Sequence, residues 1–150
     1  MSDVAKSKEL LKRYSIARIP FIAINTIERA RTLDILKEIS EELSLPFYVH
    51  TLSKGIYDLM SEKVISDDKS VYGAIDFMSE QMKRKQYMTL VLTEVIDLSS
   101  DNSDSKQILD LVTLANESGG VVIVLTNNAV WNQLQRLGMV IKIDLPNEDE

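Results

Sequence analysis

Residues 119–128, Gly-Gly-Val-Val-Ile-Val-Leu-Thr-Asn-Asn, decide the fold of this chain. Their five consecutive apolar residues, four of them β-branched, are too few for a helix and do not alternate with polar residues. This pattern predicts a strand buried on both faces, and such strands occur mainly in parallel sheets that helices cover on both sides. Ligands usually bind at the carboxyl ends of such strands, so Thr126, Asn127 and Asn128 mark a candidate binding edge.

The composition predicts one globular domain. The chain has 150 residues, of which 45% are hydrophobic and 27% charged, and it has no cysteine. The length suffices for one ordinary core, and the lack of thiols excludes disulfides and thiolate metal sites. No apolar run is long enough to span a membrane, and the charged residues 1–14 do not resemble a secretory signal. We therefore expect a cytoplasmic protein.

The net charge of −6 argues against non-specific nucleic-acid binding, which needs a basic face. The one basic run, Lys83-Arg84-Lys85, leaves a nucleic-acid role open as a third possibility. A simpler interpretation places this run in the last turn of a helix, where cations interact favourably with the helix dipole. Nucleic acid is therefore not an expected partner.

The order of the elements predicts an α/β sandwich. Strand patterns occur at residues 19–24, 47–52, 88–95, 121–125 and 139–145. Helical patterns occur at residues 3–14, 26–43, 71–82, 104–115 and 130–137, and we expect residues 56–65 to begin as a helix and become irregular. Right-handed crossovers then give a three-layer sandwich with a five-stranded parallel sheet. We expect one domain, with an N-terminal helix at 1–16, an α/β core at 17–146 and an acidic tail at 147–150.

The turn after the first strand lacks the residues that hold nucleotide phosphates. A phosphate loop needs glycines, whose backbone N–H groups can approach the phosphates, together with a lysine and a serine or threonine. Here the turn is Asn-Thr-Ile-Glu-Arg at residues 25–29, and no glycine precedes Gly55. Glu28 would also place a carboxylate beside the phosphate oxygens. We therefore expect no Walker A loop, no catalysis and no cofactor.

Two strand ends carry residues that an ATPase would use. Glu94 follows an apolar strand, at the position where P-loop ATPases hold magnesium and polarise water. Many buried strands end in a carboxylate, however, so a structural or surface role is favoured for Glu94. Asn127 resembles the sensor residue that orients water in ATPases of the AAA+ class. Asparagine after a strand also caps helices or bonds local backbone, which is the favoured interpretation of Asn127 taken alone.

We expect no metal site. His50 is the only histidine, and its place inside a strand favours a hydrogen-bonded packing residue over a metal ligand. Asp97, Asp101 and Asp104 lack the glycine and the terminal glutamate of a calcium loop. A solvated loop is favoured there, with Asp104 and Gln107 as a capping box for the next helix.

Together, the elements resemble the α/β subdomain of an AAA+ ATPase. The match includes the first strand, the strands that end at Glu94 and Asn127, and the closing residues 143–146, Ile-Asp-Leu-Pro. In that class the sheet order is 5-1-4-3-2, with the strands numbered along the chain, which puts the strand of residues 119–128 at the centre. The helical lid of that class is missing from these 150 residues. Arg136 lies near the region of the arginine finger, but an unpaired surface arginine is the favoured interpretation.

A narrower resemblance covers almost the whole chain. Its residues are Ala17–Ile22, Thr26, Glu28, Arg29, Pro46–Val49 and Gly55. They are similar to the N-terminal domain of the AAA+ proteins first known as conserved open reading frames of chloroplast and cyanobacterial genomes. In that family the N-terminal domain is a degenerate module without a Walker A loop, and a working ATPase domain follows it. His50 replaces an expected tryptophan, and the sequence leaves open whether the chain is an excised domain or a shortened relative.

These observations favour a non-catalytic AAA+-like domain that acts in assembly or partner recognition, as the accessory N-terminal part of a larger ATPase. The expected partner is an AAA+ domain, another protein or a second copy of the chain, and Glu94, Asn127 and Arg136 are then vestigial. The alternative is a small-molecule or nucleotide-binding module. It would use the polar strand ends Asn25, Thr26, Thr51, Ser53, Lys54, Thr93, Glu94 and Asn127.

Overall fold

The structure is a computed structural model that describes residues 3–84, 88–94, 98–100 and 102–143. Its helices are α1 (Asp3–Ile16), α2 (Arg29–Leu43), α3 (Val71–Lys83), α4 (Ser103–Ser118) and α5 (Asn132–Gln135). Its strands are β1 (Phe21–Asn25), β2 (Phe47–Thr51), β3 (Gly55–Asp58), β4 (Val64–Ser66), β5 (Thr89–Leu92), β6 (Val121–Thr126) and β7 (Gly138–Lys142). The expected acidic tail at 147–150 lies outside the described residues. No helix within these ranges has the length and apolar character that a membrane span requires.

The sheet corrects the predicted five-stranded parallel architecture. Within the described residues, seven strands form one mixed sheet in the order β4-β3-β2-β5-β6-β1-β7. The five strands expected from the sequence are neighbours in the predicted order, and each adjacent pair among them is parallel. The added strands β3 and β4 extend the sheet beyond β2, and both pair in an antiparallel manner.

The hairpin of β3 and β4 replaces the helix expected at the start of residues 56–65. Ile56 and Tyr57 are buried because β3 pairs with β2, which places His50 opposite Ile56 and Val49 opposite Tyr57. A short apolar run is compatible with either a strand or a helix, and the open edge of β2 favours the strand. Gly55 begins β3 with a φ of +78°, a backbone conformation that glycine adopts without strain.

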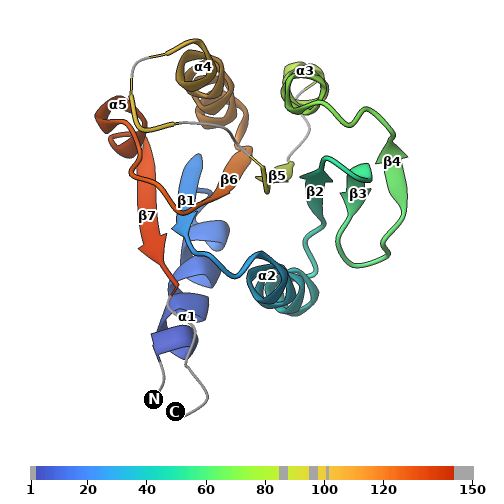
Figure 1. Ribbon diagram of the computed structural model, residues 1–150. Coiled ribbons are helices and arrows are strands. Elements are labelled where there is room, and N and C mark those ends of the chain that lie inside the picture. Colours follow the sequence, from blue (N-terminus) through green and yellow to red (C-terminus); the bar gives the residue numbers. More distant parts are fainter. Residues whose placement is uncertain (1–2, 85–87, 95–97, 101, 144–150) are drawn as a thin grey trace.

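Helices cover both faces of the sheet, as the sandwich prediction requires. Figure 1 shows α3, α4 and α5 on one face and α1 and α2 on the other. The strand residues alternate between two buried clusters: Val122 and Val124 of β6 pack toward α3 and α4, whereas Ile123 and Leu125 pack toward α2. Residues 121–125 are all at most 5% exposed, so the prediction that this strand is buried on both faces is confirmed.

Two helix boundaries differ from the prediction. Helix α2 begins at Arg29, so Ile27 lies in the preceding turn and is 84% exposed, although its spacing had suggested the apolar face of the helix. Helix α4 begins at Ser103, and its cap is Asn102, whose side-chain oxygen accepts a 2.8 Å hydrogen bond from the Ser105 N–H group. The expected capping box of Asp104 and Gln107 is therefore wrong, since Asp104 is already inside the first turn.

The turn from α4 to β6 is made by Gly119 and Gly120. Gly119 ends α4 with a φ of +80°, and the N–H group of Gly120 reaches back 3.0 Å to the carbonyl oxygen of Ala115. A left-handed residue at this position is a common way to end a helix, and glycine adopts it without strain. The chain therefore enters β6 directly and runs between β1 and β5.

Candidate functional site

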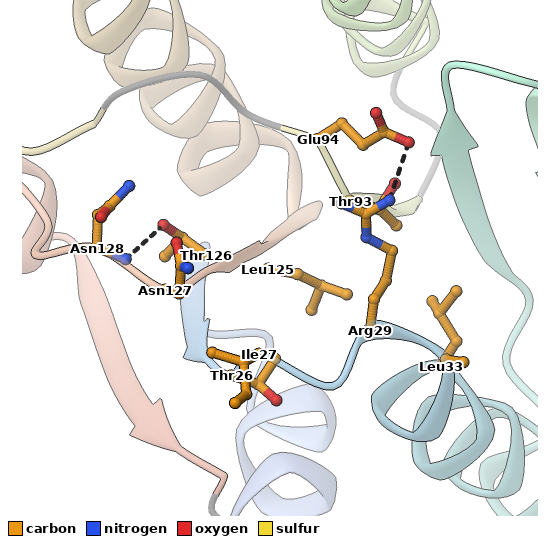
Figure 2. Close-up of a pocket in the computed structure, with 11 residues that line it drawn as sticks. Thr26, Ile27, Arg29, Leu33, Thr93, Glu94, Leu125, Thr126, Asn127 and Asn128 are labelled. Atoms are coloured by element: carbon orange, nitrogen blue, oxygen red, sulfur yellow. Dashed lines mark hydrogen bonds and ion pairs between the residues drawn. The ribbon is translucent and has the colours of Figure 1, made fainter.

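A pocket of about 510 Å³ lies at the carboxyl edge of the sheet, beside the first turn of α2. Figure 2 shows side chains from α2, from β6 and from the residues that follow β1, β5 and β6 around it. The lining residues are Thr26, Ile27, Arg29, Ala30, Leu33, Thr93, Glu94, Leu125, Thr126, Asn127 and Asn128. The pocket is therefore at the place where open α/β sheets usually bind ligands.

The register of the parallel strands brings these residues together. Asn25 of β1 lies opposite Thr126 of β6, so the chain leaves both strands at the same level. Leu92 of β5 lies opposite Val124 of β6, so Thr93 and Glu94 follow on the other side of β6. Three strand ends far apart in the sequence thus converge on one pocket.

An ion pair closes one side of the pocket. Arg29 Nη1 donates a 3.0 Å hydrogen bond to Glu94 Oε1, which joins the first turn of α2 to the end of β5. The Arg29 side chain is 51% exposed and that of Glu94 is 24% exposed, so solvent still reaches both groups. The Glu94 carboxylate therefore has a cationic partner from its own chain, and its favoured structural or surface role fits this geometry.

The connection from β1 to α2 is short and internally hydrogen-bonded. It consists of Thr26, Ile27 and Glu28. The Thr26 N–H group donates to the carbonyl oxygen of Thr126 at 2.9 Å, and the Glu28 N–H group donates to Thr26 Oγ1 at 3.1 Å. Two backbone donors of this turn are thus already used by the protein and do not point into the pocket as free groups.

The opposite wall is formed by the residues that follow β6. Thr126 Oγ1 accepts a 3.1 Å hydrogen bond from the Asn128 N–H group, so threonine makes the local backbone contact that we had expected of Asn127. Asn127 and Asn128 are exposed. Among the described residues, neither carboxamide has a hydrogen-bond partner, which leaves both available to a ligand.

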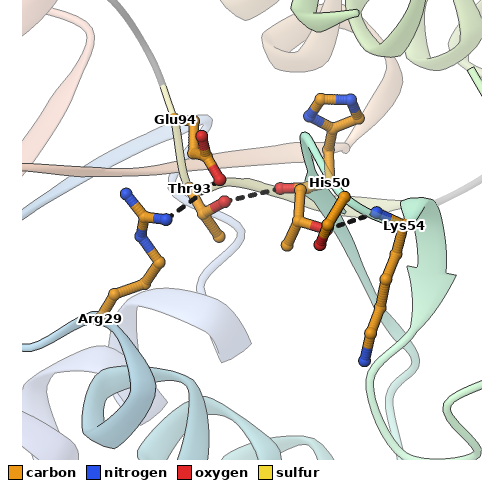
Figure 3. Close-up of polar contacts among 7 residues, drawn as sticks. Arg29, His50, Lys54, Thr93 and Glu94 are labelled. Atoms are coloured by element: carbon orange, nitrogen blue, oxygen red, sulfur yellow. Dashed lines mark hydrogen bonds and ion pairs between the residues drawn. The ribbon is translucent and has the colours of Figure 1, made fainter. Parts of the chain in front are cut away.

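His50 lies close to the site but faces away from it (Figure 3). Its side chain is fully buried, so its packing role is confirmed. Burial lowers the pKa of His50, and the nearby backbone of Asp68 and Lys69 opposes that shift. Neither ring nitrogen reaches a partner with normal hydrogen-bond geometry in the described part of the chain, so the expectation of a hydrogen-bonded histidine is wrong.

Only some of the predicted edge residues line the pocket. Thr26, Thr93, Glu94 and Asn127 do so, whereas the remaining candidates do not. These are Asn25, whose carbonyl oxygen accepts a hydrogen bond from the Ile143 N–H group, Thr51 at the end of β2, and Ser53 and Lys54 in the turn between β2 and β3. Lys54 Nζ instead lies 4.9 Å from the centre of the Tyr57 ring.

Arg136 lies at the opposite edge of the sheet. It is exposed and lies two residues before β7, and Gly138, the first residue of β7, is opposite Phe21, the first residue of β1. Parallel pairing therefore places Arg136 at the amino ends of the strands, away from Glu94 and Asn127. The structure does not bring the three vestigial positions together.

The remaining candidates contribute nothing to the pocket. Lys83 is in the last turn of α3, as predicted, and Arg84 follows it, while Lys85 lies outside the described residues. Asp97 and Asp101 also lie outside them, and Asp104 accepts a 2.6 Å hydrogen bond from the Tyr72 hydroxyl group. No group of three potential metal ligands occurs within the residues that the structure describes.

Sequence reasoning did not identify Arg29, Leu33 or Leu125 as site residues. For Arg29 a signal was available, because Arg29 and Arg31 place two cations in the first turn of α2, which contains no acidic residue. Cations are unfavourable at that end of a helix, so a nearby carboxylate could have been expected. Leu33 and Leu125 carry no comparable signal, since both are ordinary core residues by pattern.

Comparisons with known proteins agree with this fold. Residues 7–143 match the model of a family described as "SpoVK-like AAA ATPase, N-terminal domain". The structure of AMPPCP-bound DnaA from Aquifex aeolicus is similar, with a TM-score of 0.53 and 11% sequence identity over 99% of this chain. That match covers 49% of the DnaA chain, so this chain spans about half its length, and the low identity supports the fold alone. No curated protein matches the sequence. Because the family model covers most of the chain, the chain belongs to the SpoVK-like AAA ATPase N-terminal domain family.

Proposed function

We propose that this domain is a non-catalytic AAA+-like module that acts in assembly or partner recognition, as the accessory N-terminal part of a larger ATPase. The family description supports the position within a larger protein, since it names an N-terminal domain of AAA ATPases. The partner would be an AAA+ domain, another protein or a second copy of the chain. The proposal includes the narrower relationship to the chloroplast and cyanobacterial proteins and a cytoplasmic location.

The β1–α2 connection is the observation that carries this proposal. A phosphate loop wraps around the phosphates and presents several free N–H groups. The three residues Thr26, Ile27 and Glu28 are too few for such a loop, and the N–H groups of Thr26 and Glu28 are already engaged. Nucleotide phosphates would therefore find no cradle here.

The state of Glu94 supports the same conclusion. A magnesium-binding or water-polarising carboxylate must be free to face the metal or the water. Here Glu94 is paired with Arg29, and Arg29 is the only cationic residue among the described residues that line the pocket. A metal at Glu94 would therefore meet a carboxylate whose charge Arg29 already compensates.

Calorimetric titration with ATP and magnesium tests the proposal. We expect no binding tighter than about 1 mM, because each phosphate would lose water without gaining a backbone partner. Micromolar affinity would overturn the proposal, as would ATP hydrolysis that Glu94→Gln abolishes and Glu28→Gln preserves. The Glu28 variant is a matched control because this exposed carboxylate is near the pocket but does not line it.

A second function is favoured by the pocket itself. Its volume is within the range of small-molecule sites, and residues of α2, of β6 and of the connections after β1, β5 and β6 contribute to it. The polar groups of Glu94 and Asn127 would orient a ligand, and the buried Leu125 would contact its apolar part. Binding of a small molecule at this edge is therefore compatible with a domain that has no catalytic role.

A further inference from the structure

The Arg29–Glu94 ion pair has unused hydrogen-bonding groups on its open side. The pair engages Arg29 Nη1 and Glu94 Oε1. In the part of the chain that the structure describes, Arg29 Nε and Nη2 and Glu94 Oε2 have no hydrogen-bond partner. One positive and one negative group therefore stand side by side at the pocket wall, each able to receive a group of opposite charge.

The base of the pocket is apolar. Ala30 and Leu33 of α2 and Leu125 of β6 line it, and Leu125 is only 5% exposed. Figure 2 shows Leu125 between Arg29 on one side and Asn127 on the other. An aliphatic group that enters the pocket would cover these side chains and remove them from water.

The polar groups on the far side add both donors and acceptors. Asn127 and Asn128 each carry a carboxamide that can donate and accept, and neither is engaged within the described residues. The pocket as a whole therefore offers balanced charge, an apolar base and neutral polar groups. A ligand with a single kind of charge would satisfy only one member of the ion pair and face the other as a like charge.

We propose that this pocket binds a small zwitterion, specifically a free α-amino acid with an aliphatic side chain. The ligand ammonium group would face Glu94 Oε2, and its carboxylate would face the free edge of Arg29. The charged groups of an α-amino acid are attached to one carbon atom, which suits a protein pair whose atoms lie 3.0 Å apart. The side chain would then rest on Leu33 and Leu125.

This inference rests on the proposed function, because it requires the pocket to be free of nucleotide. The first test measures thermal unfolding of the whole chain with about 10 mM L-leucine, 4-methylpentanoate or 3-methylbutan-1-amine. The second compound lacks the ammonium group of leucine, and the third lacks its carboxylate. We expect leucine to raise Tm by about 2–4 °C and each of the others by less than about 1 °C.

Two variants and a matched control locate the effect. Arg29→Gln and Glu94→Gln should each weaken leucine binding by about tenfold, because each removes one charge contact. Arg31→Gln should leave it unchanged, since Arg31 is an exposed cation of the same helical turn that does not line the pocket. Amide chemical shifts of the wild-type chain should move at residues 26–33 and 125–128, which provides a readout even if a variant fails to fold.

Several results would overturn the inference. These are no Tm shift with leucine, equal shifts with the two singly charged analogues, unchanged leucine binding in both variants, or chemical-shift changes outside the pocket. Titration with ATP and magnesium distinguishes this failure from failure of the proposed function. Micromolar ATP binding refutes the non-catalytic assignment, whereas absence of both ATP and leucine binding refutes only the amino-acid site.

Discussion

Thr93 Oγ1 donates a 2.8 Å hydrogen bond to the carbonyl oxygen of His50 (Figure 3). The bond joins Thr93, which follows β5, to the neighbouring strand β2. It lies just beyond His50 and Leu92, the last paired residues of these two strands. Thr93 is 3% exposed, so the bond is shielded from water. It therefore extends the pairing of β2 and β5 to the level of the pocket.

Replacing Thr93 by valine should destabilise the domain by about 1–2 kcal/mol, because the carbonyl group of His50 would stay buried without its donor. Urea unfolding of the variant provides the measurement. Thr113→Val is the matched control: the Thr113 hydroxyl also donates to a backbone carbonyl, that of Leu109, but Thr113 is exposed and water can replace the bond. Equal effects of the two substitutions would contradict the role assigned to burial.

His50 should make stability depend on pH. Its imidazole is buried and has no hydrogen-bond partner in the part of the chain that the structure describes, and burial lowers its pKa below the ordinary value of about 6.5 that the unfolded chain retains. Between the two values the unfolded state binds more protons, so stability falls as the pH is lowered through about 6.5 and below. The nearby carboxylates of Asp68 and Glu94 oppose the pKa shift without reversing it.

Unfolding free energies measured from pH 7.5 to 5 should therefore decrease in the wild type and stay nearly level in His50→Phe. His50 is the only histidine, so no other histidine contributes to this slope. The carboxyl groups titrate mainly below this range, at about pH 4. A variant with the same slope as the wild type would show that folding leaves the pKa of His50 unchanged, which would contradict this prediction.

Helix α1 is attached to α2 by a network of charges. Lys8 Nζ lies 2.9 Å from Glu42 Oε1 and 3.0 Å from Glu38 Oε2. Lys12 Nζ lies 3.0 Å from Glu42 Oε2. Hydrogen bonds from Lys8, and to a smaller extent from Lys12, lower the pKa of the Glu42 carboxyl group. The network therefore stabilises the fold above about pH 4, and this stabilisation is lost as the pH falls further. Glu42→Gln should lower Tm at low ionic strength.

Salt should remove most of this difference, because the groups are exposed and screened in concentrated electrolyte. Scanning calorimetry in about 0.02 M and about 1 M sodium chloride would measure it. Glu41→Gln serves as the control, since Glu41 is exposed in the same turn and has no ion pair among the described residues. A Tm difference for Glu42→Gln that persists in high salt would point to packing instead of charge.

Gly138 is required where β7 joins the sheet. A Cβ atom at this position would overlap the backbone carbonyl group of Phe21 in β1, and neither strand can move without breaking the ladder. Gly138→Ala should destabilise the domain by about 1–3 kcal/mol. Gly120→Ala should cost less, because its added methyl group meets the flexible end of Met82. Chemical denaturation of both variants tests this order, and the reverse order would contradict it.

Much of the fold was predictable because the core strands carry strong local patterns. Residues 121–125 and 21–24 are unbroken apolar runs, and both are buried on two faces. The hairpin at residues 55–66 was not predictable, because Val64 and Ile65 are exposed and only pairing with β2 selects strand over helix. Ile27 had helical spacing, but the chain turns through it before α2 begins.

The candidate site was predictable in part. Parallel strands end at one edge, so Thr26, Thr93, Glu94 and Asn127 could be grouped before their positions were known. Thr51 ends β2 and Lys54 follows it, but the turn to β3 directs the chain away from the pocket. Strand ends identify an edge, whereas the connection after each strand decides which residues face the pocket.

The sequence by itself determined the layered α/β architecture and the absence of glycine from the first turn, and its resemblance to the AAA+ class implied the order of the five parallel strands. The architecture follows from periodicity and residue type, which act over a few neighbouring residues. The tertiary structure alone decided that Arg29 pairs with Glu94, that Arg136 lies at the opposite edge, and that His50 is buried without a hydrogen-bond partner among the described residues. Such relationships join residues far apart in the chain, and they exist only once packing has set the strand register and the direction of each connection.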